Sequence, residues 1–297
     1  MARLAYLGTP DLAVPPLRAL VGAGHVVALV VTRPDRRRGR GSATSPSPVK
    51  AAALELGLAV TDRVADVTGA GVELGVVVAY GRLVPASVLE AVPMVNLHFS
   101  LLPRWRGAAP LERAILAGDP VTGVCVMALE ATLDTGPLYA CEEVEIAPAE
   151  TLEHLRRRLV EVGSRLLVET LAGGVGGLGP PVPQTGDPTY AAKVDPAELE
   201  LALDRPAAEL ERVVRLGRAW TTFRGQRLGV VRAEVAPAPP GARPGTLAGD
   251  VVATGDGGLR LLEVQPEGRR AMAVDDWRRG ARPDDGEVLG AEPAGGR

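Results

Sequence analysis

The strongest constraint on the fold is an alternation of strand-like and helix-like apolar patterns in the first half of the chain. Apolar runs at residues 3–8, 26–32 and 75–79 are typical of buried parallel strands, and segments 14–23 and 50–56 are typical of the helices between them. This alternation predicts a doubly wound, Rossmann-like α/β domain with right-handed crossovers. Ligands in such domains bind beyond the carboxyl ends of the strands, where the strand order reverses.

The next strand-like run, at residues 91–95, leads directly into the most informative motif of the chain. Side chains two apart on a strand share a face, so Asn96 and His98 should project together while Leu97 points the other way. An amide donor beside an imidazole suits a site that must polarise a carbonyl group and move a proton. We therefore expect catalytic chemistry at this strand end.

A carboxylate belonging to the same site is expected at Asp134, in a loop-type sequence that follows the strand-like run 123–129. A carboxylate close to an imidazole stabilises its protonated form. An aspartate before Thr-Gly also commonly caps a turn, so the residue pattern alone leaves both roles open. The other two histidines, His25 and His154, have no such companions, and we expect them to be structural.

Several common site types are not expected. The only cysteines, Cys125 and Cys141, lack metal-ligand spacing, and we interpret them as small apolar side chains in a reducing cytoplasm. The first turn, Gly8 to Asp11, lacks the glycine spacing of a dinucleotide site. No apolar run reaches about eighteen residues, and the first predicted strand starts almost at the N-terminus, so we expect neither a membrane span nor a signal peptide.

The length of 297 residues favours two domains. A long amphipathic helix is predicted at 151–170, with Thr151 as its N-cap, and glycine and proline are frequent after it. We place a linker at 184–200, between a catalytic domain at 1–183 and a second domain at 201–297. In the second domain, a predicted helix at 206–218 is followed by short strand-like runs with turn signals, which is typical of a small β-barrel.

The formal net charge of −3 argues against general binding of nucleic acid, but the arginines are clustered. Five arginines fall between residues 33 and 40, and six arginines without any acidic residue fall between residues 212 and 233. Local clusters of this kind bind phosphate on proteins that are acidic overall. A solvated loop and a solvated helix face explain them equally well.

Several segments carry a family resemblance. The run Asn96-Leu-His-Phe-Ser-Leu-Leu-Pro103, together with Leu133-Asp-Thr-Gly136, resembles the signature of the folate-dependent formyltransferases. The longer run 100–110 resembles the branch that acts on initiator tRNA, and three other segments agree with that branch: 7–17, 32–50 and 76–83. The resemblance extends from about residue 3 to about residue 290 and so covers both predicted domains.

The resemblance implies transfer of a formyl group from 10-formyltetrahydrofolate to the amino group of methionine on initiator tRNA. It assigns catalysis to Asn96, His98 and Asp134, and part of the folate site to four residues: Ser100, Leu101, Leu102 and Pro103. It also implies an OB-like C-terminal domain, a fold often used to bind nucleic acid. We accordingly expect a cytoplasmic monomer that uses formyl folate and initiator methionyl-tRNA but needs neither a metal nor a membrane.

The same resemblance implies a tRNA-contacting loop around Arg40, which matches the family's key loop arginine. The family usually has two lysines where this chain has Ser42 and Ala43, which weakens the loop's phosphate-binding role unless neighbouring arginines compensate. The segment before Ala219 is also shorter than in the family. We expect tRNA contacts from the loop and from the second-domain helix through six arginines: Arg36, Arg38, Arg40, Arg212, Arg215 and Arg218.

Two other functions stay open at the level of sequence. Another folate-dependent formyltransferase would act on a sugar nucleotide or on glycinamide ribonucleotide, although enzymes of the latter kind carry a glycine-rich phosphate cradle that Gly8 to Asp11 does not resemble. From a different class, the chain would be a noncatalytic RNA-binding module on a formyltransferase scaffold. The presence of Asn96, His98 and Asp134 together argues against that alternative.

Overall fold

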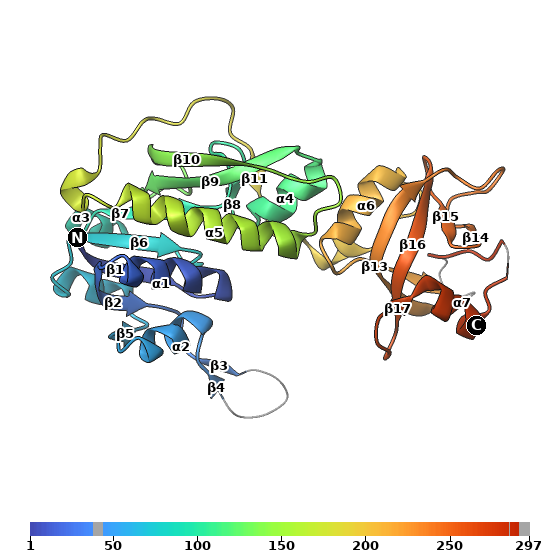
Figure 1. Cartoon of the computed structure of the whole chain (residues 1–297), viewed down its shortest axis with the longest axis horizontal. Helices are drawn as coiled ribbons and strands as arrows, with labels where there is room; N and C mark the ends of the chain where they lie inside the picture. Colours follow the sequence, from blue (N-terminus) through green and yellow to red (C-terminus); the bar gives the residue numbers. More distant parts are fainter. Residues whose placement is uncertain (38–43, 285, 291–297) are drawn as a thin grey trace. The chain divides into compact units, whose positions relative to one another are not determined.

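The computed structural model describes residues 1–37, 44–284 and 286–290, which form two compact units (Figure 1). The first unit consists of Met1–Leu111, Pro120–Ile146 and Leu155–Ala192. The second unit consists of Glu112–Asp119, Ala147–His154 and the described residues from Lys193 onward. The change of unit after Ala192 falls inside the segment 184–200.

The first unit is built on a seven-stranded sheet, with strands β1 (Arg3–Gly8), β2 (Val26–Val31), β5 (Val60–Thr61), β6 (Leu74–Val78), β7 (Met94–His98), β9 (Val121–Ala128) and β10 (Leu138–Glu145). The strand order is β10-β9-β7-β6-β1-β2-β5. Strands β5, β2, β1, β6 and β7 pair in parallel, whereas β9 runs antiparallel to β7, and β10 antiparallel to β9. The predicted doubly wound α/β layer is confirmed, with an antiparallel extension.

The same part of the chain contains these helices: α1 (Val14–Gly22), α2 (Pro48–Glu55), α3 (Ala86–Ala91), α4 (Pro110–Ala117) and α5 (Leu152–Thr170). Most of α4 belongs to the second unit. The helices predicted at 14–23, 50–56 and 151–170 are confirmed to within two residues at each end. The remaining elements are short: η1 (Asp11–Ala13), β3 (Arg36–Arg37), β4 (Thr44–Ser45), η2 (Val64–Gly69), β8 (Arg106–Gly107), η3 (Val175–Gly177) and β11 (Tyr190–Ala191).

Side chains at their first residues explain where the helices α2 and α5 begin. The Ser47 hydroxyl accepts the backbone N–H of Lys50 at 3.0 Å, with proline in the first turn of α2. The Thr151 hydroxyl accepts the backbone N–H of His154 at 3.3 Å, as the predicted N-cap requires. Each such cap stabilises its helix by about 1 kcal/mol because it pairs an N–H that the helix itself leaves unbonded.

The interpretation of the two cysteines as separate small apolar side chains is wrong. Cys125 of β9 and Cys141 of β10 lie directly opposite each other in the antiparallel register, and they form a disulfide rather than two separate thiols. The pairing depends on β10, a strand that the sequence patterns did not predict. Without that strand, a separation of 16 residues gives no indication of contact.

The second unit is built on an antiparallel sheet of β12 (Trp220–Phe223), β13 (Gln226–Ala236), β14 (Leu247–Ala248), β15 (Val251–Ala253), β16 (Gly258–Pro266) and β17 (Met272–Ala273). It also contains η4 (Pro196–Leu199), α6 (Ala207–Arg215) and α7 (Val274–Ala281). Leu210 and Val213 of α6 share a core with Val264 and Trp277, and the Trp277 ring meets Phe223 edge to face at 5.0 Å between centroids. The predicted fold class, an α/β domain followed by a smaller β domain, is confirmed.

Within the part of the chain that the structure describes, no helix combines the length and apolar composition that crossing a membrane requires.

Candidate active site

Asn96 and His98 occupy the carboxyl end of β7, with side chains on the face turned away from α5. Leu97 between them points toward α5, because a Cβ added to Gly163 of that helix would lie 3.1 Å from Leu97 Cδ2. Side chains alternate along a strand, so Asn96 and His98 share the opposite face, as the sequence predicts. Only 8% of Asn96 and 6% of His98 is exposed, so both are positioned by their surroundings.

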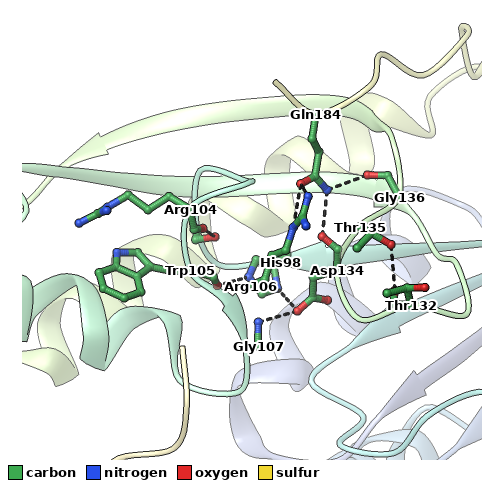
Figure 2. Close-up of polar contacts among 11 residues, drawn as sticks. His98, Arg104, Trp105, Arg106, Gly107, Thr132, Asp134, Thr135, Gly136 and Gln184 are labelled. Atoms are coloured by element: carbon green, nitrogen blue, oxygen red, sulfur yellow. Dashed lines mark hydrogen bonds and ion pairs between the residues drawn. The ribbon is translucent and has the colours of Figure 1, made fainter. Parts of the chain in front are cut away.

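His98 has a protein partner at each ring nitrogen (Figure 2). Its Nε2 lies 3.0 Å from the backbone oxygen of Trp105, and a carbonyl oxygen only accepts, so Nε2 carries a hydrogen in this arrangement. Its Nδ1 lies 3.7 Å from Oδ2 of Asp134. The ring is therefore held between a backbone carbonyl on its Nε2 side and a carboxylate on its Nδ1 side.

Asp134 is 5% exposed and lies in the loop between β9 and β10. The backbone N–H of Gly107 donates to its Oδ2 at 2.8 Å, the same oxygen that faces His98. Its φ of 53° lies in the left-handed region, which costs a residue other than glycine about 1–2 kcal/mol. Aspartate adopts this conformation more readily than most residues, so the φ fits either role, and it is the position of Oδ2 opposite His98 that associates Asp134 with the site.

Residues 100–107 form the loop that closes over His98. The Ser100 hydroxyl, fully buried, donates to the backbone oxygen of Arg104 at 2.6 Å, and Leu102 packs in a small buried cluster with Cys125 and Met127. Trp105 has a positive φ of 62°, which turns its carbonyl toward His98. The side chains of Ser100 and Leu102 thus shape this loop from within, while Leu101 and Pro103 are half-buried.

A segment that sequence reasoning assigned to the linker contributes to the same site. Gln184 contacts the Asp134 loop, and the Thr189 hydroxyl accepts the backbone N–H of Trp105 at 2.8 Å. Strand β11 then pairs in parallel with β8. The only sequence signal for this role was the interruption of the glycine- and proline-rich stretch by Gln184 and by the run from Thr189 to Lys193.

The Asn96 amide makes no hydrogen bond with another residue within the described ranges, whereas His98 and Asp134 are both engaged. A buried amide without a protein partner retains its donor for a bound molecule. The three side chains thus bring together one available amide and one imidazole backed by a carboxylate. Such a set can stabilise negative charge on a carbonyl oxygen and transfer a proton.

The predicted phosphate-binding arginines of the loop are only partly described. Arg36 lies in the short strand β3, while Arg38 and Arg40 lie outside the described residues.

The predicted basic helix face is wrong in its geometry. Helix α6 ends at Arg215, because Gly217 takes a left-handed φ of 80°, so Arg218 lies beyond the helix and is exposed. Arg212 donates to the backbone oxygen of Leu116, and Arg215 donates to that of Glu150 at 2.8 Å, both within the second unit. These two guanidinium groups therefore hold carbonyl groups in place and do not form a free cationic face.

Comparison with known proteins identifies the family of the chain. Residues 2–171 match the family described as formyl transferase, and residues 193–282 match the formyl transferase C-terminal domain. A relative named methionyl-tRNA formyltransferase from Roseobacter denitrificans is 43% identical over 97% of this chain and 98% of its own. A relative of the same name from Symbiobacterium thermophilum is 42% identical over 94% of this chain and 93% of its own.

Solved structures share the fold at low sequence identity. HypX from Aquifex aeolicus, in complex with tetrahydrofolic acid, is 15% identical with a TM-score of 0.64, over 94% of this chain and 47% of its own. An N-formyltransferase from Helicobacter canadensis, in complex with folinic acid and dTDP-3-aminofucose, is 15% identical with a TM-score of 0.65, over 90% of this chain and 100% of its own. From the two matched domains and the relatives that align along nearly the whole length, the chain belongs to the formyl transferase family.

Proposed function

We propose that this protein transfers the formyl group of 10-formyltetrahydrofolate to the amino group of methionine esterified to initiator tRNA. The observation that carries the proposal is the identity of 43%, along 97% of the chain, to a relative named methionyl-tRNA formyltransferase. The buried group of Asn96, His98 and Asp134 supports it, because this chemistry requires a donor and an imidazole backed by a carboxylate.

The reaction needs no covalent enzyme intermediate, because the free amine of the acceptor is already a nucleophile. Its attack on the formyl carbon forms a tetrahedral intermediate whose oxygen carries negative charge. The Asn96 amide donates to that oxygen, and the imidazolium of His98 donates beside it. Donors already aimed at a developing oxyanion each contribute about a hundredfold or more in rate, because they need no reorganisation during the reaction.

The contacts of His98 define how it takes part. The hydrogen on Nε2 points to the backbone oxygen of Trp105 at 3.0 Å, and this bond is exchanged for the formyl oxygen when the substrates bind. Asp134 remains on the Nδ1 side, where its charge stabilises the imidazolium. The proton lost by the amine then reaches the folate nitrogen that leaves, through His98 or a water molecule beside it.

The donor and the tRNA use different parts of the chain. We assign the folate to the loop of Ser100, Leu101, Leu102 and Pro103, through backbone groups and the half-buried Leu101 and Pro103 rather than the buried side chains. We assign the tRNA to Arg36, Arg38 and Arg40 and to the exposed Arg218. Arg212 and Arg215 add positive charge near Arg218 but are held by backbone carbonyls.

The remaining parts of the proposal concern the setting of the reaction. We propose that the protein acts as a monomer in the cytoplasm, with the domain division at 184–200 and without a metal. The second candidate, transfer to a sugar nucleotide or to glycinamide ribonucleotide, has weaker support, because the named relatives align along nearly the whole chain, including residues 193–282. The third candidate, a noncatalytic RNA-binding module, does not explain the buried Asn96, His98 and Asp134.

Turnover with alternative acceptors tests the proposal. We would supply formyl-labelled 10-formyltetrahydrofolate with methionyl initiator tRNA, a dTDP-amino sugar or glycinamide ribonucleotide, and measure label transferred to each. We expect kcat/KM for the methionyl-tRNA to exceed that for either alternative by at least about a thousandfold, because only the macromolecular acceptor uses the basic residues assigned to tRNA. A higher value for either small acceptor, or no transfer at all, would reject the proposal.

A further inference from the structure

Gln184 uses every hydrogen-bonding group of its side-chain amide, and all of them connect parts of the active site (Figure 2). Its Nε2 donates to the backbone oxygen of Asp134 at 2.9 Å and to that of Gly136 at 2.8 Å. Its Oε1 accepts from Arg106, at 3.1 Å from Nε and 2.6 Å from Nη2. One neutral side chain therefore joins the Asp134 loop to the loop that closes over His98.

The bonds to Asp134 and Gly136 act on a backbone that has little freedom. Asp134 has a φ of 53°, a conformation that residues other than glycine seldom adopt without support. At Gly136, an added Cβ would lie 1.9 Å from the backbone oxygen of Ala128, so the loop passes tightly against β9. Because a carboxylate side chain follows its own backbone, the two bonds from Gln184 determine where the Asp134 oxygens point.

The same segment also sets the other partner of His98. The Thr189 hydroxyl accepts the N–H of Trp105, and the Thr189 backbone oxygen accepts the N–H of Arg106 at 2.9 Å. The Trp105 carbonyl faces His98 Nε2, and the next residue but one, Gly107, donates to Asp134. The segment from Gln184 to Thr189 therefore fixes the groups on both sides of the imidazole.

We infer that Gln184 is a positioning residue for formyl transfer, acting on His98 through Asp134; among the described residues, its side chain hydrogen-bonds to Asp134, Gly136 and Arg106 and not to His98 itself. The inference rests on the proposed function, since the reaction it serves is the one proposed above. The first expectation is that loss of the two donated bonds lowers kcat while the KM for the formyl donor stays nearly unchanged.

The substitution Gln184→Glu separates the hydrogen bonds that the Gln184 amide donates from those that it accepts. Glutamate keeps the length of the side chain and an acceptor for Arg106, but it loses both donors and directs an oxygen at the two carbonyls. We expect kcat to fall by at least about tenfold, because misplacement of a catalytic group by a fraction of an ångström is costly. The matched control is Gln226→Glu, the same change at an exposed glutamine, which should leave kcat unchanged.

A double-mutant cycle shows whether the effect passes through Asp134. In an Asp134→Asn background, Gln184→Glu should reduce kcat by no more than about twofold, since the charge that Gln184 positions is already absent. Effects that multiply would overturn the inference. Gln184→Met, which removes every polar atom, serves as a second variant if the glutamate variant proves unstable on thermal unfolding.

A spectroscopic measurement tests the inference without turnover. The chain has three histidines, so nitrogen-15 spectra of the imidazole groups give three resolvable sets of signals. Gln184→Glu should move the His98 signals in the direction that Asp134→Asn moves them, while those of His25 and His154 stay in place. Unchanged His98 signals would overturn the inference. If the wild-type protein shows no turnover, only the proposed function is rejected, because the spectra test the contact between Gln184 and Asp134 without any reaction.

Discussion

Replacing Asp134 by asparagine removes the negative charge beside His98 while it keeps the size of the side chain and an acceptor for the Gly107 N–H. The carboxylate is 5% exposed, and its Oδ2 lies 3.7 Å from His98 Nδ1, so little water screens the pair. The variant therefore isolates the electrostatic part of the role of Asp134 and leaves the hydrogen bond at 2.8 Å to Gly107 in place.

The distance sets the size of the effect. With an effective dielectric constant of about 20, unit charges 3.7 Å apart attract by about 4.5 kcal/mol. If the variant loses half of this attraction for the imidazolium that donates to the oxyanion, the transition state is destabilised by about 2.2 kcal/mol, and loss of the whole attraction destabilises it by about 4.5 kcal/mol. At 1.36 kcal/mol for each tenfold change, kcat should fall between about 40-fold and about 2,000-fold.

The assay is steady-state formylation at saturating formyl folate and acceptor, with thermal unfolding measured for each variant. Asp62→Asn, at an exposed carboxylate of the same unit, is the control and should retain the wild-type kcat. His98→Ala should also lower kcat by at least about a hundredfold, and the double variant should lose far less than the product of the two effects. A kcat for Asp134→Asn within threefold of the wild type would refute the electrostatic argument.

Three other predictions concern separate parts of the molecule. Asn96→Ala should lower kcat by about a hundredfold with little change in folate affinity, because it removes an oxyanion donor; a changed KM with normal kcat would contradict this. Arg218→Ala should reduce the salt dependence of tRNA binding by about one phosphate contact. Arg212→Gln and Arg215→Gln should mainly lower the melting temperature, because these two arginines bind backbone carbonyls. If tRNA binding depends equally on salt in all three variants, this distinction is wrong. Burial and the positive N-terminus lower the pKa of His25 below 6.5, so the unfolded chain binds this proton before the folded chain does. The free energy of unfolding should therefore fall as the pH drops below about 6.5. If a His25→Asn variant shows the same dependence of unfolding free energy on pH between pH 5 and 8, His25 is not the cause.

The parts of the fold that follow from the sequence are those with a strong local period. β1, α1 and β2 alternate between runs of buried apolar residues and an amphipathic helix, and the period of two along β7 places Asn96 and His98 on one face. β10 was missed because Glu142, Glu143 and Glu145 interrupt any apolar alternation at the edge of the sheet. Once β10 was missing, its disulfide was unpredictable as well, since that depends on strand register.

The site residues also divide into those that a local sequence pattern indicates and those that only the tertiary structure brings in. A side chain that acts beside its own sequence neighbours, such as His98, leaves a recognisable motif, but Gln184 contacts residues 48 and 50 positions away. The helix holding Arg212 and Arg215 was predicted too long because Gly217, in a left-handed conformation, ends it before Arg218. Long-range hydrogen bonds and the turn chosen by one glycine depend on tertiary structure, which a local pattern does not contain.

The group around His98 is proposed to formylate the amine of methionyl initiator tRNA. The most direct measurement follows formyl-labelled 10-formyltetrahydrofolate into the aminoacyl ester, releases the amino acid, and identifies the labelled product for the wild type and for His98→Ala. We predict labelled N-formylmethionine from the wild type, formed at least about a hundredfold more slowly by the variant. A folded wild-type protein that leaves the methionine unlabelled, or a His98→Ala variant that forms N-formylmethionine at the wild-type rate, would contradict this assignment.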